Sequence, residues 1–247
     1  MIDLNADLGE GMSSDDDLLG IVTSVNVACG GHAGDRATMQ RTVARAHSRR
    51  VAIGAHPSYP DREEFGRRRM TIPSAALRES LSEQIAALAA VAGEEGTQVR
   101  YLKPHGALYH AVLDDDEHAG ALVAAAAEHS LPLLLAPQAH QRTVGALAEA
   151  SGVRIYGEGF ADRGYDDEGY LLPRQRPGAV LSQPEDALAQ ALELTRGRVR
   201  THSGAQLPLI VRSICVHGDT PGAIELARSI RAGLSRAKVD IRAWSEP

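Results

Sequence analysis

Side chains that can transfer protons or bind cations recur at the ends of short apolar segments of this sequence. The clusters are Asn5, Asp7 and Glu10; His32 and Asp35; His56 and Asp61; Lys103 and His105; and His217 and Asp219. Carboxylates and imidazoles act as general acids, general bases or metal ligands, and an ammonium group stabilises a developing oxyanion. A single histidine after a strand is usually structural, but the repetition of the pattern predicts one polar site assembled from several segments.

The first cluster lies in residues 3–11, DLNADLGEG, where apolar and polar residues alternate and then give way to two glycines. A period of two is typical of a strand, and glycine permits the turn that follows it. Carboxylates are costly to gather unless a metal, a substrate or nearby cations compensate their charge. We therefore expect a metal, a substrate or nearby cations to compensate this cluster.

Lys103 follows a short apolar segment and precedes Pro104. At the mouth of a barrel, a lysine can pair with a carboxylate or stabilise an oxyanion, and a structural salt bridge to Asp7 or Glu10 is the simpler alternative. Asp7, His56 and His105 could instead hold a divalent metal, with open positions for water and substrate. Their spacing in the sequence does not decide between these possibilities.

Several other site types are absent from the sequence. It has no G-x-x-x-x-G-K-[ST] loop, no G-x-G-x-x-G after a predicted strand and no G-x-S-x-G elbow. Cys29 precedes Gly30, Gly31 and His32, but we expect it to pack at a strand end rather than to act as a nucleophile. Carboxylate, histidine and lysine remain as the working groups.

The overall composition restricts the partners and the compartment. A net charge of −6 argues against a nucleic-acid partner. The N-terminus has neither a basic region nor an apolar region typical of a signal peptide, and no apolar run approaches the roughly 20 residues needed to cross a membrane. We expect a cytoplasmic protein without a membrane partner, and the two cysteines predict no disulfide framework.

Strand and helix patterns alternate along the chain without a break in composition. Strands are expected at residues 2–7, 21–28, 51–54, 99–103, 132–136, 153–157, 213–216 and 239–243. Helices are expected at residues 13–19, 35–49, 74–91, 116–129, 138–150, 184–195 and 221–237, with loops at 56–70, 104–109 and 158–178 and a hairpin within 199–212. The pattern predicts a single domain, residues 1–247, with an α/β fold of the (β/α)7–8 barrel type. An open, doubly wound sheet is the alternative.

Six motifs carry a resemblance to a known family. They are DLNADLGEG, NVACGGHAGD, GAHPSYPD, KPHGALY, FADRGY and CVHGD. Together they resemble the LamB/YcsF family, which comprises the A subunits of ATP-hydrolysing 5-oxoprolinases, from residue 3 to about residue 234. The resemblance implies a barrel related to the glycoside hydrolase and deacetylase group. It also implies hydrolysis of the lactam of 5-oxo-L-proline (pyroglutamate) to L-glutamate, coupled to ATP and performed with partner subunits B and C.

The absence of a nucleotide-binding loop agrees with ATP being bound together with the partner subunits. An unactivated lactam opens with little gain in free energy, and phosphorylation of its oxygen offsets that deficit. The candidate catalytic residues are Asp7, Glu10, Lys103, His105 and His217. In the ring opening that the resemblance implies, Asp7 or Glu10 would be the base, and a histidine or Lys103 would stabilise the developing charge. The candidate substrate-binding residues are Asn5, His32, Arg163, Arg174 and Asp219, with either arginine able to clamp the substrate carboxylate.

A fainter similarity connects the chain with carbohydrate deacetylases of the YdjC type, and it maps Asp7, His56 and His105 onto their metal ligands. A stand-alone, metal-dependent amide or N-acetyl hydrolase is therefore a second hypothesis. A non-catalytic scaffold subunit is a third.

Overall fold

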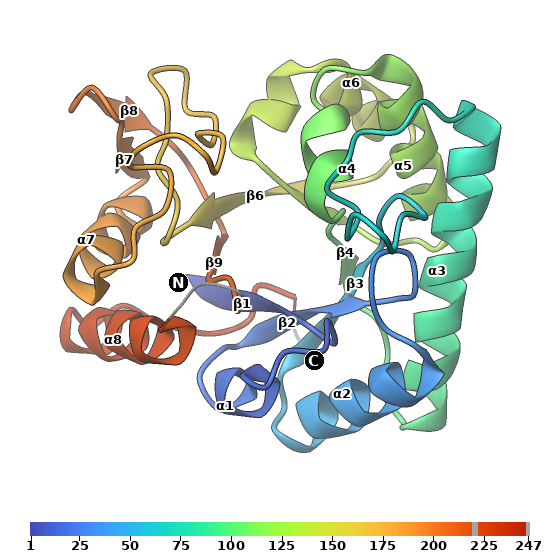
Figure 1. Ribbon diagram of the computed structural model, residues 1–247, viewed down its shortest axis with the longest axis horizontal. Coiled ribbons are helices and arrows are strands. Elements are labelled where there is room, and N and C mark those ends of the chain that lie inside the picture. Colours follow the sequence, from blue (N-terminus) through green and yellow to red (C-terminus); the bar gives the residue numbers. More distant parts are fainter. Residues whose placement is uncertain (219–221, 246–247) are drawn as a thin grey trace.

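The computed structural model describes residues 1–218 and 222–245, and its centre is a closed barrel of parallel strands (Figure 1). The barrel strands, in order around it, are β1 (Asp3–Leu8), β2 (Ser24–Ala28), β3 (Ala52–His56), β4 (Tyr101–Leu102), β5 (Leu133–Leu135), β6 (Ile155–Phe160) and β9 (Ser213–Cys215). β9 pairs with both β1 and β6 and so closes the ring. The prediction of a barrel is confirmed, with seven strands in it.

Helices cover the outside of the barrel, as short parallel crossovers require. They are α1 (Asp15–Leu19), α2 (Arg36–Ser48), α3 (Ser74–Glu94), α4 (Gly106–Ala111), α5 (Asp116–Glu128), α6 (Thr143–Ala150), α7 (Pro184–Thr195) and α8 (Ala223–Arg236), with a 3-10 turn, η1, at Pro137–Gln141. On α3, buried residues recur at the spacing of one helical face, namely Leu77, Leu81, Ile85 and Leu88. Among the described residues, none of the helices combines the length and apolar character that a membrane span requires.

The interior of the barrel is polar around β1. Asn5 donates hydrogen bonds to Ser213 on the adjacent β9 and to Glu158 on β6, at 2.7 and 3.1 Å. Because β9 separates β1 from β6 in the ring, the contact with Glu158 must run through the barrel interior. The alternation in residues 3–8 therefore buries both faces of the strand: the polar side chains point into the barrel and the apolar ones pack against helices.

Four local predictions differ from the structure. Residues 106–111 form α4 instead of a loop, and the predicted helix at 138–150 is divided between η1 and α6. The sixth strand runs further, to Phe160. The segment 239–243 contributes only one bridge, between Ile2 and Ile241, instead of an eighth barrel strand.

The predicted hairpin is confirmed. β7 (Arg198–Arg200) and β8 (Gln206–Pro208) pair antiparallel outside the barrel. The start of α8 predicted at residue 221 lies outside the described residues, and the described helix begins at Ala223.

Candidate functional site

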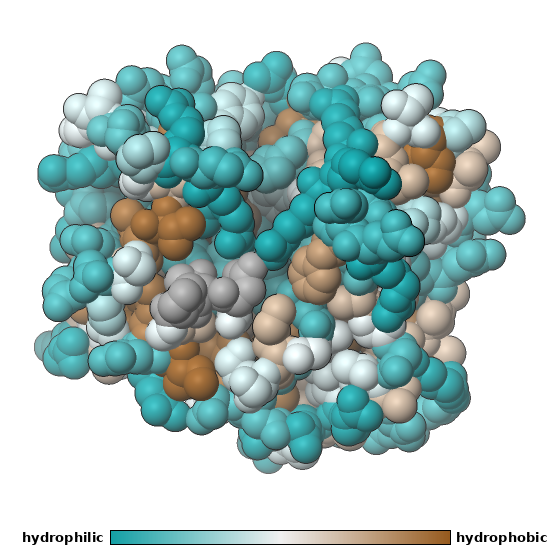
Figure 2. Space-filling view, in the orientation of Figure 1, coloured by the Kyte–Doolittle hydropathy of each residue, from teal (hydrophilic) through white to brown (hydrophobic). Residues whose placement is uncertain are grey.

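The polar clusters meet at the carboxyl ends of the barrel strands, where parallel α/β barrels gather functional side chains. Six of their members, Asp7, Glu10, His56, Lys103, His105 and His217, line a pocket of about 460 Å³. Asp35 instead caps α2, where its side chain accepts from the backbone N–H of Thr38. The lining includes Asp7, Glu10, His56, Arg67, Lys103, His105, Tyr109, His110, Phe160, Arg163, Arg174 and His217. The space-filling view shows a hollow near the middle of this face, flanked by hydrophilic side chains (Figure 2).

Lys103 is buried in the floor of the pocket between two carboxylates. Its ammonium nitrogen lies 2.9 Å from Asp7 Oδ1, 2.9 Å from Glu158 Oε1 and 3.2 Å from Cys215 Sγ. Burial alone disfavours the ammonium, but the surrounding acidic groups raise the pKa of Lys103 well above its ordinary value. The lysine is therefore a fixed positive charge. It forms the salt bridge to Asp7 that is one of the alternatives expected from the sequence.

Asp7 is held as an anion. Its Oδ1 accepts from Lys103 and, at 2.7 Å, from Asn26 Nδ2, and its Oδ2 lies 3.4 Å from His56 Nε2. Burial acts to raise the pKa of Asp7, but His56 and Lys103 together lower it well below the ordinary value. Glu158 is the contrasting partner, because burial raises its pKa despite the hydrogen bond from Lys103.

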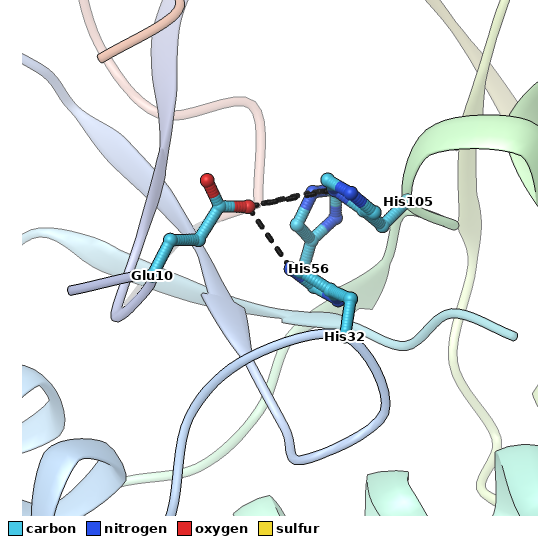
Figure 3. Close-up of side chains that lie close together, drawn as sticks. All are labelled: Glu10, His32, His56 and His105. Atoms are coloured by element: carbon cyan, nitrogen blue, oxygen red, sulfur yellow. Dashed lines mark hydrogen bonds and ion pairs between the residues drawn. The ribbon is translucent and has the colours of Figure 1, made fainter. Parts of the chain in front are cut away.

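Three histidines from separate segments surround the carboxylate of Glu10 (Figure 3). Glu10 Oε1 lies 3.0 Å from His32 Nε2, 3.4 Å from His105 Nδ1 and 3.9 Å from His56 Nε2. The His32 and His105 rings stack at 3.6 Å, and the His56 ring is perpendicular to both. Burial and the neighbouring His56 lower the pKa of His32 to about 2 and also lower that of His105.

A close approach of two backbone segments places His105. Gly106 has φ of +56°, and a Cβ there would lie 2.7 Å from the carbonyl oxygen of Gly66. Only glycine tolerates both conditions. The turn that contains Gly66 can therefore pack over His105, and the carbonyl of Phe65 in that turn accepts a hydrogen bond from His105 Nε2 at 3.0 Å.

His217 is oriented by Asp162 on the other side of the pocket. The two carboxylate oxygens lie 2.9 and 3.0 Å from His217 Nδ1, and one of them also accepts the backbone N–H of His217 at 3.2 Å. Burial raises the pKa of Asp162, but the hydrogen bonds and charge of His217 bring it below the ordinary value. A histidine held at Nδ1 by a carboxylate presents Nε2 as a base, as in many hydrolytic sites.

The predicted substrate-binding residues divide into two groups. Arg163 and Arg174 line the pocket. Arg163 also donates to the carbonyls of Ala179 and Leu172, at 3.0 and 2.6 Å, so it fixes the loop after β6. Asn5 and His32 are buried and do not line the pocket, and Asp219 lies outside the described residues.

Candidate metal ligands fall into two groups in the described part of the chain. One contains Glu10, His32, His56 and His105, and the other contains Asp7, Cys215 and His217. The metal set expected from the sequence, Asp7, His56 and His105, is therefore spread over both groups. Its assignment stays a prediction.

Three residues of the site are not among the candidates that the sequence pattern indicates: Asn26, Glu158 and Asp162. Asp162 stands within the FADRGY motif, and Glu158 begins the predicted polar loop after β6, so both are visible in the sequence as polar residues near a strand end. The predicted sixth strand ends at residue 157, one residue before Glu158, whereas β6 continues to Phe160. The predicted boundary therefore places Glu158 in a loop instead of the barrel interior. Nothing in the local pattern separates Asn26 from the rest of its strand.

The fold and the site together define a class: an α/β-barrel protein with a charged, histidine-rich pocket at the carboxyl ends of its strands. Within that class, the LamB/YcsF family matches residues 2–247, and the chain belongs to this family.

Relatives agree with this assignment over their whole lengths. A protein from Streptomyces avermitilis, named as the A subunit of 5-oxoprolinase, is 47% identical, over 99% of this chain and all of that one. A protein of the same name from Nocardia farcinica is 47% identical, over 98% of this chain and 99% of the relative. The crystal structure of a lactam utilization protein from Thermus thermophilus matches with a TM-score of 0.91 and 35% identity, over 98% and 99% of the two chains.

More distant structures share the fold alone. A family 4 carbohydrate esterase from Streptomyces lividans matches with a TM-score of 0.52 and 11% identity, over 98% of this chain and 90% of the esterase. This likeness supports the predicted relation to deacetylase barrels.

Proposed function

We propose that this chain is the A subunit of an ATP-dependent 5-oxoprolinase that hydrolyses the lactam of 5-oxo-L-proline to L-glutamate with partner subunits B and C. The observation that carries the proposal is the pocket. It gathers the Lys103 ammonium, the Asp7 carboxylate and the His217–Asp162 pair around one space at the strand ends. The names of the relatives supply the substrate class.

The reaction requires one base and one proton donor. A water oxygen bonds to the lactam carbonyl carbon as the base takes a proton from the water, the ring C–N bond breaks, and the protonated base gives its proton to the ring nitrogen. A second water releases the phosphoryl group on the carbonyl oxygen as phosphate. His217 is the residue best oriented to remove the proton from water, because Asp162 holds its Nδ1–H and leaves Nε2 as the acceptor. We assign this role to His217 in place of Asp7 or Glu10, since Asp7 Oδ1 already accepts two hydrogen bonds and Glu10 Oε1 pairs with His32 Nε2.

Positive charge in the pocket serves two purposes. The Lys103 ammonium in the floor, whose three N–H groups face Asp7, Glu158 and Cys215, stabilises the developing negative charge through its electric field rather than through a hydrogen bond. Arg163 and Arg174 both line the pocket, and we assign the carboxylate of the substrate to this pair of guanidinium groups from the loop after β6.

ATP enters the proposal through the partner subunits. The sequence contains no phosphate-binding loop of the G-x-x-x-x-G-K-[ST] type. Activation of the lactam by ATP is therefore assigned to subunits B and C, and ring opening to this chain. With the two steps assigned to different subunits, we expect the isolated chain not to hydrolyse 5-oxo-L-proline.

Reconstitution tests the proposal. Glutamate release from 5-oxo-L-proline is measured for this chain, for the partner subunits and for the mixture, with and without ATP. We expect release only from the complete mixture with ATP. ATP-independent hydrolysis of amides or N-acetyl sugars by the isolated chain would instead support the stand-alone hydrolase. If mixtures that contain the Asp162→Asn or the Lys103→Met chain keep full turnover, the chain is a non-catalytic scaffold subunit.

A further inference from the structure

The cluster around Glu10 contains a contact between two imidazole nitrogens that needs an added positive charge, either a proton on one ring or a bound cation. His56 Nδ1 lies 2.8 Å from the carbonyl oxygen of Lys103, and His105 Nε2 lies 3.0 Å from the carbonyl oxygen of Phe65. A carbonyl oxygen only accepts, so both of these ring nitrogens carry hydrogen. The remaining nitrogens, His56 Nε2 and His105 Nδ1, therefore present lone pairs to one another.

These two lone pairs are 3.1 Å apart, and neither nitrogen can donate to the other in the neutral form. A carboxylate oxygen of Glu10, which is also an acceptor, completes the group at 3.4 and 3.9 Å. Three acceptors thus converge on one point within a buried part of the site. Glu10 Oε1 also accepts from His32 Nε2, and a cation at that point would be attracted by the carboxylate and by both imidazole lone pairs.

The spacing fits a metal ion. In a tetrahedral site with bonds of about 2.0–2.1 Å, neighbouring ligand atoms are about 3.3 Å apart. The three separations in the cluster, 3.1, 3.4 and 3.9 Å, bracket this value. Imidazole nitrogens with one carboxylate favour a transition metal such as Zn²⁺ over Mg²⁺, which prefers oxygen ligands.

His32 has a different place in the cluster. Its ring is parallel to that of His105, with 2° between the planes and 3.6 Å between the centres. A metal in the plane of one ring would lie far out of the plane of the other, so the two cannot bind the same ion in this arrangement. His32 Nε2 instead lies 3.0 Å from Glu10 Oε1, the distance of a hydrogen bond that orients the carboxylate.

We infer that Glu10, His56 and His105 bind one divalent transition-metal ion, with Zn²⁺ as the best match. His32 is a positioning residue that holds Glu10 in place. The three ligands all line the pocket, which leaves the remaining coordination positions open to water or to a substrate oxygen. An ion there would supply Lewis-acid activation of that oxygen. The inference concerns binding alone and stands independently of the proposed 5-oxoprolinase activity.

Metal binding by the full chain provides the test, without any measurement of turnover. The purified chain is stripped with a chelator, dialysed against Zn²⁺ or Co²⁺, and analysed for metal content, for the visible absorption of Co²⁺ and for its unfolding temperature. We expect one ion per chain, a Co²⁺ spectrum typical of nitrogen and oxygen ligands, and a higher unfolding temperature with metal. A wild-type chain that binds neither ion would overturn the inference.

Variants then identify the ligands. Glu10→Gln and His105→Ala should each weaken Zn²⁺ binding by at least about ten-fold, because losing a ligand costs no less than losing an outer partner. His47→Ala, at an exposed position on α2, is the matched control and should bind as the wild type does. Circular dichroism confirms that each variant is folded, and Glu10→Gln keeps the shape of the side chain.

The same titration separates Glu10 from Asp7 as the carboxylate ligand. Asp7 Oδ1 is already bound to Lys103 and Asn26, so Asp7→Asn should change Zn²⁺ affinity by less than about ten-fold. If Asp7→Asn weakens binding more than Glu10→Gln does, the ligand set is overturned in favour of Asp7, His56 and His105.

Discussion

The ammonium nitrogen of Lys103 lies 2.9 Å from Asp7 Oδ1, although the two residues are 96 positions apart in the chain. The Lys103 side chain is buried and that of Asp7 is 11% exposed, and Glu158 Oε1 approaches the same nitrogen at 2.9 Å. Removing one partner of a buried ion pair strongly lowers the stability of the fold, because the other partner is left as an uncompensated buried charge. The floor of the pocket is therefore sensitive to any change in its charge balance.

Lys103→Met is expected to lower both stability and turnover. Removing the ammonium leaves Asp7 and Glu158 without their shared partner, and breaking a buried pair in this way costs about 3–5 kcal/mol. Urea unfolding gives the stability, and the reconstituted mixture gives the turnover. A double variant, Lys103→Met with Glu158→Gln, should recover part of the stability and none of the turnover. Recovery of both would make Lys103 purely structural.

Asp162→Asn is expected to lower turnover with little effect on stability. The asparagine amide would donate to His217 Nδ1, which places the remaining proton on Nε2 and removes the base from the pocket. We expect kcat of the reconstituted mixture to fall by at least about ten-fold. Asp167→Asn is the control, because Asp167 is exposed in the same loop and accepts from Ser203 at 2.6 Å. Equal turnover of the two variants would contradict the assigned role of His217.

Asp3→Asn is expected to change how stability depends on pH. Burial raises the pKa of Asp3 from 3.8 to about 6. A group whose pKa is raised by folding contributes stability below its unfolded pKa, and this contribution is lost as pH rises through the folded pKa. The wild type should therefore lose roughly 1.4 kcal/mol for each pH unit between those values through Asp3.

The Asp3→Asn variant has no titrating carboxyl at this position, so it does not show this decrease in stability with rising pH. Its stability relative to the wild type should rise from pH 4 to pH 6 and level off above, as measured by urea unfolding at each pH. Asp16→Asn, at an exposed residue, gives the background. A relative stability that is flat or falls over this range would show that Asp3 is not perturbed by its burial.

Gly54→Ala is expected to destabilise the barrel. A Cβ at this position would lie 2.3 Å from the ring of Tyr101, whose hydroxyl donates to the backbone carbonyl of Val25 across the interior. The free energy of unfolding should fall by about 1–3 kcal/mol or more, because the buried ring has to move. Gly93→Ala on α3 meets nothing within 4 Å and should be neutral or stabilising by up to about 1 kcal/mol. Similar effects at the two glycines would contradict this packing argument.

Much of the architecture could be predicted because hydrophobic patterning is local. The alternation of strands and helices favours a parallel barrel over an open sheet, and the apolar spacing predicts a helix over residues 74–91, which extends to residue 94 in the structure. The ends of helices and strands could not be predicted in the same way. Whether residues 106–111 form a loop or a helix depends on the contact between Gly106 and Gly66, which are far apart in the sequence. The bridge between Ile2 and Ile241 likewise shows that a short extended pattern does not establish a barrel strand.

The sequence by itself determined which chemical groups were present and that they follow strands, because residue type and local period are properties of the chain alone. It could not determine which atoms meet. Only the tertiary structure decided that Glu10 faces three histidines, that Asp162 holds His217, and that Lys103 joins Asp7 to Glu158. The reason is physical: barrel closure sets distances of a few ångströms between residues far apart in sequence, and hydrogen bonds, metal coordination and pKa values depend on those distances.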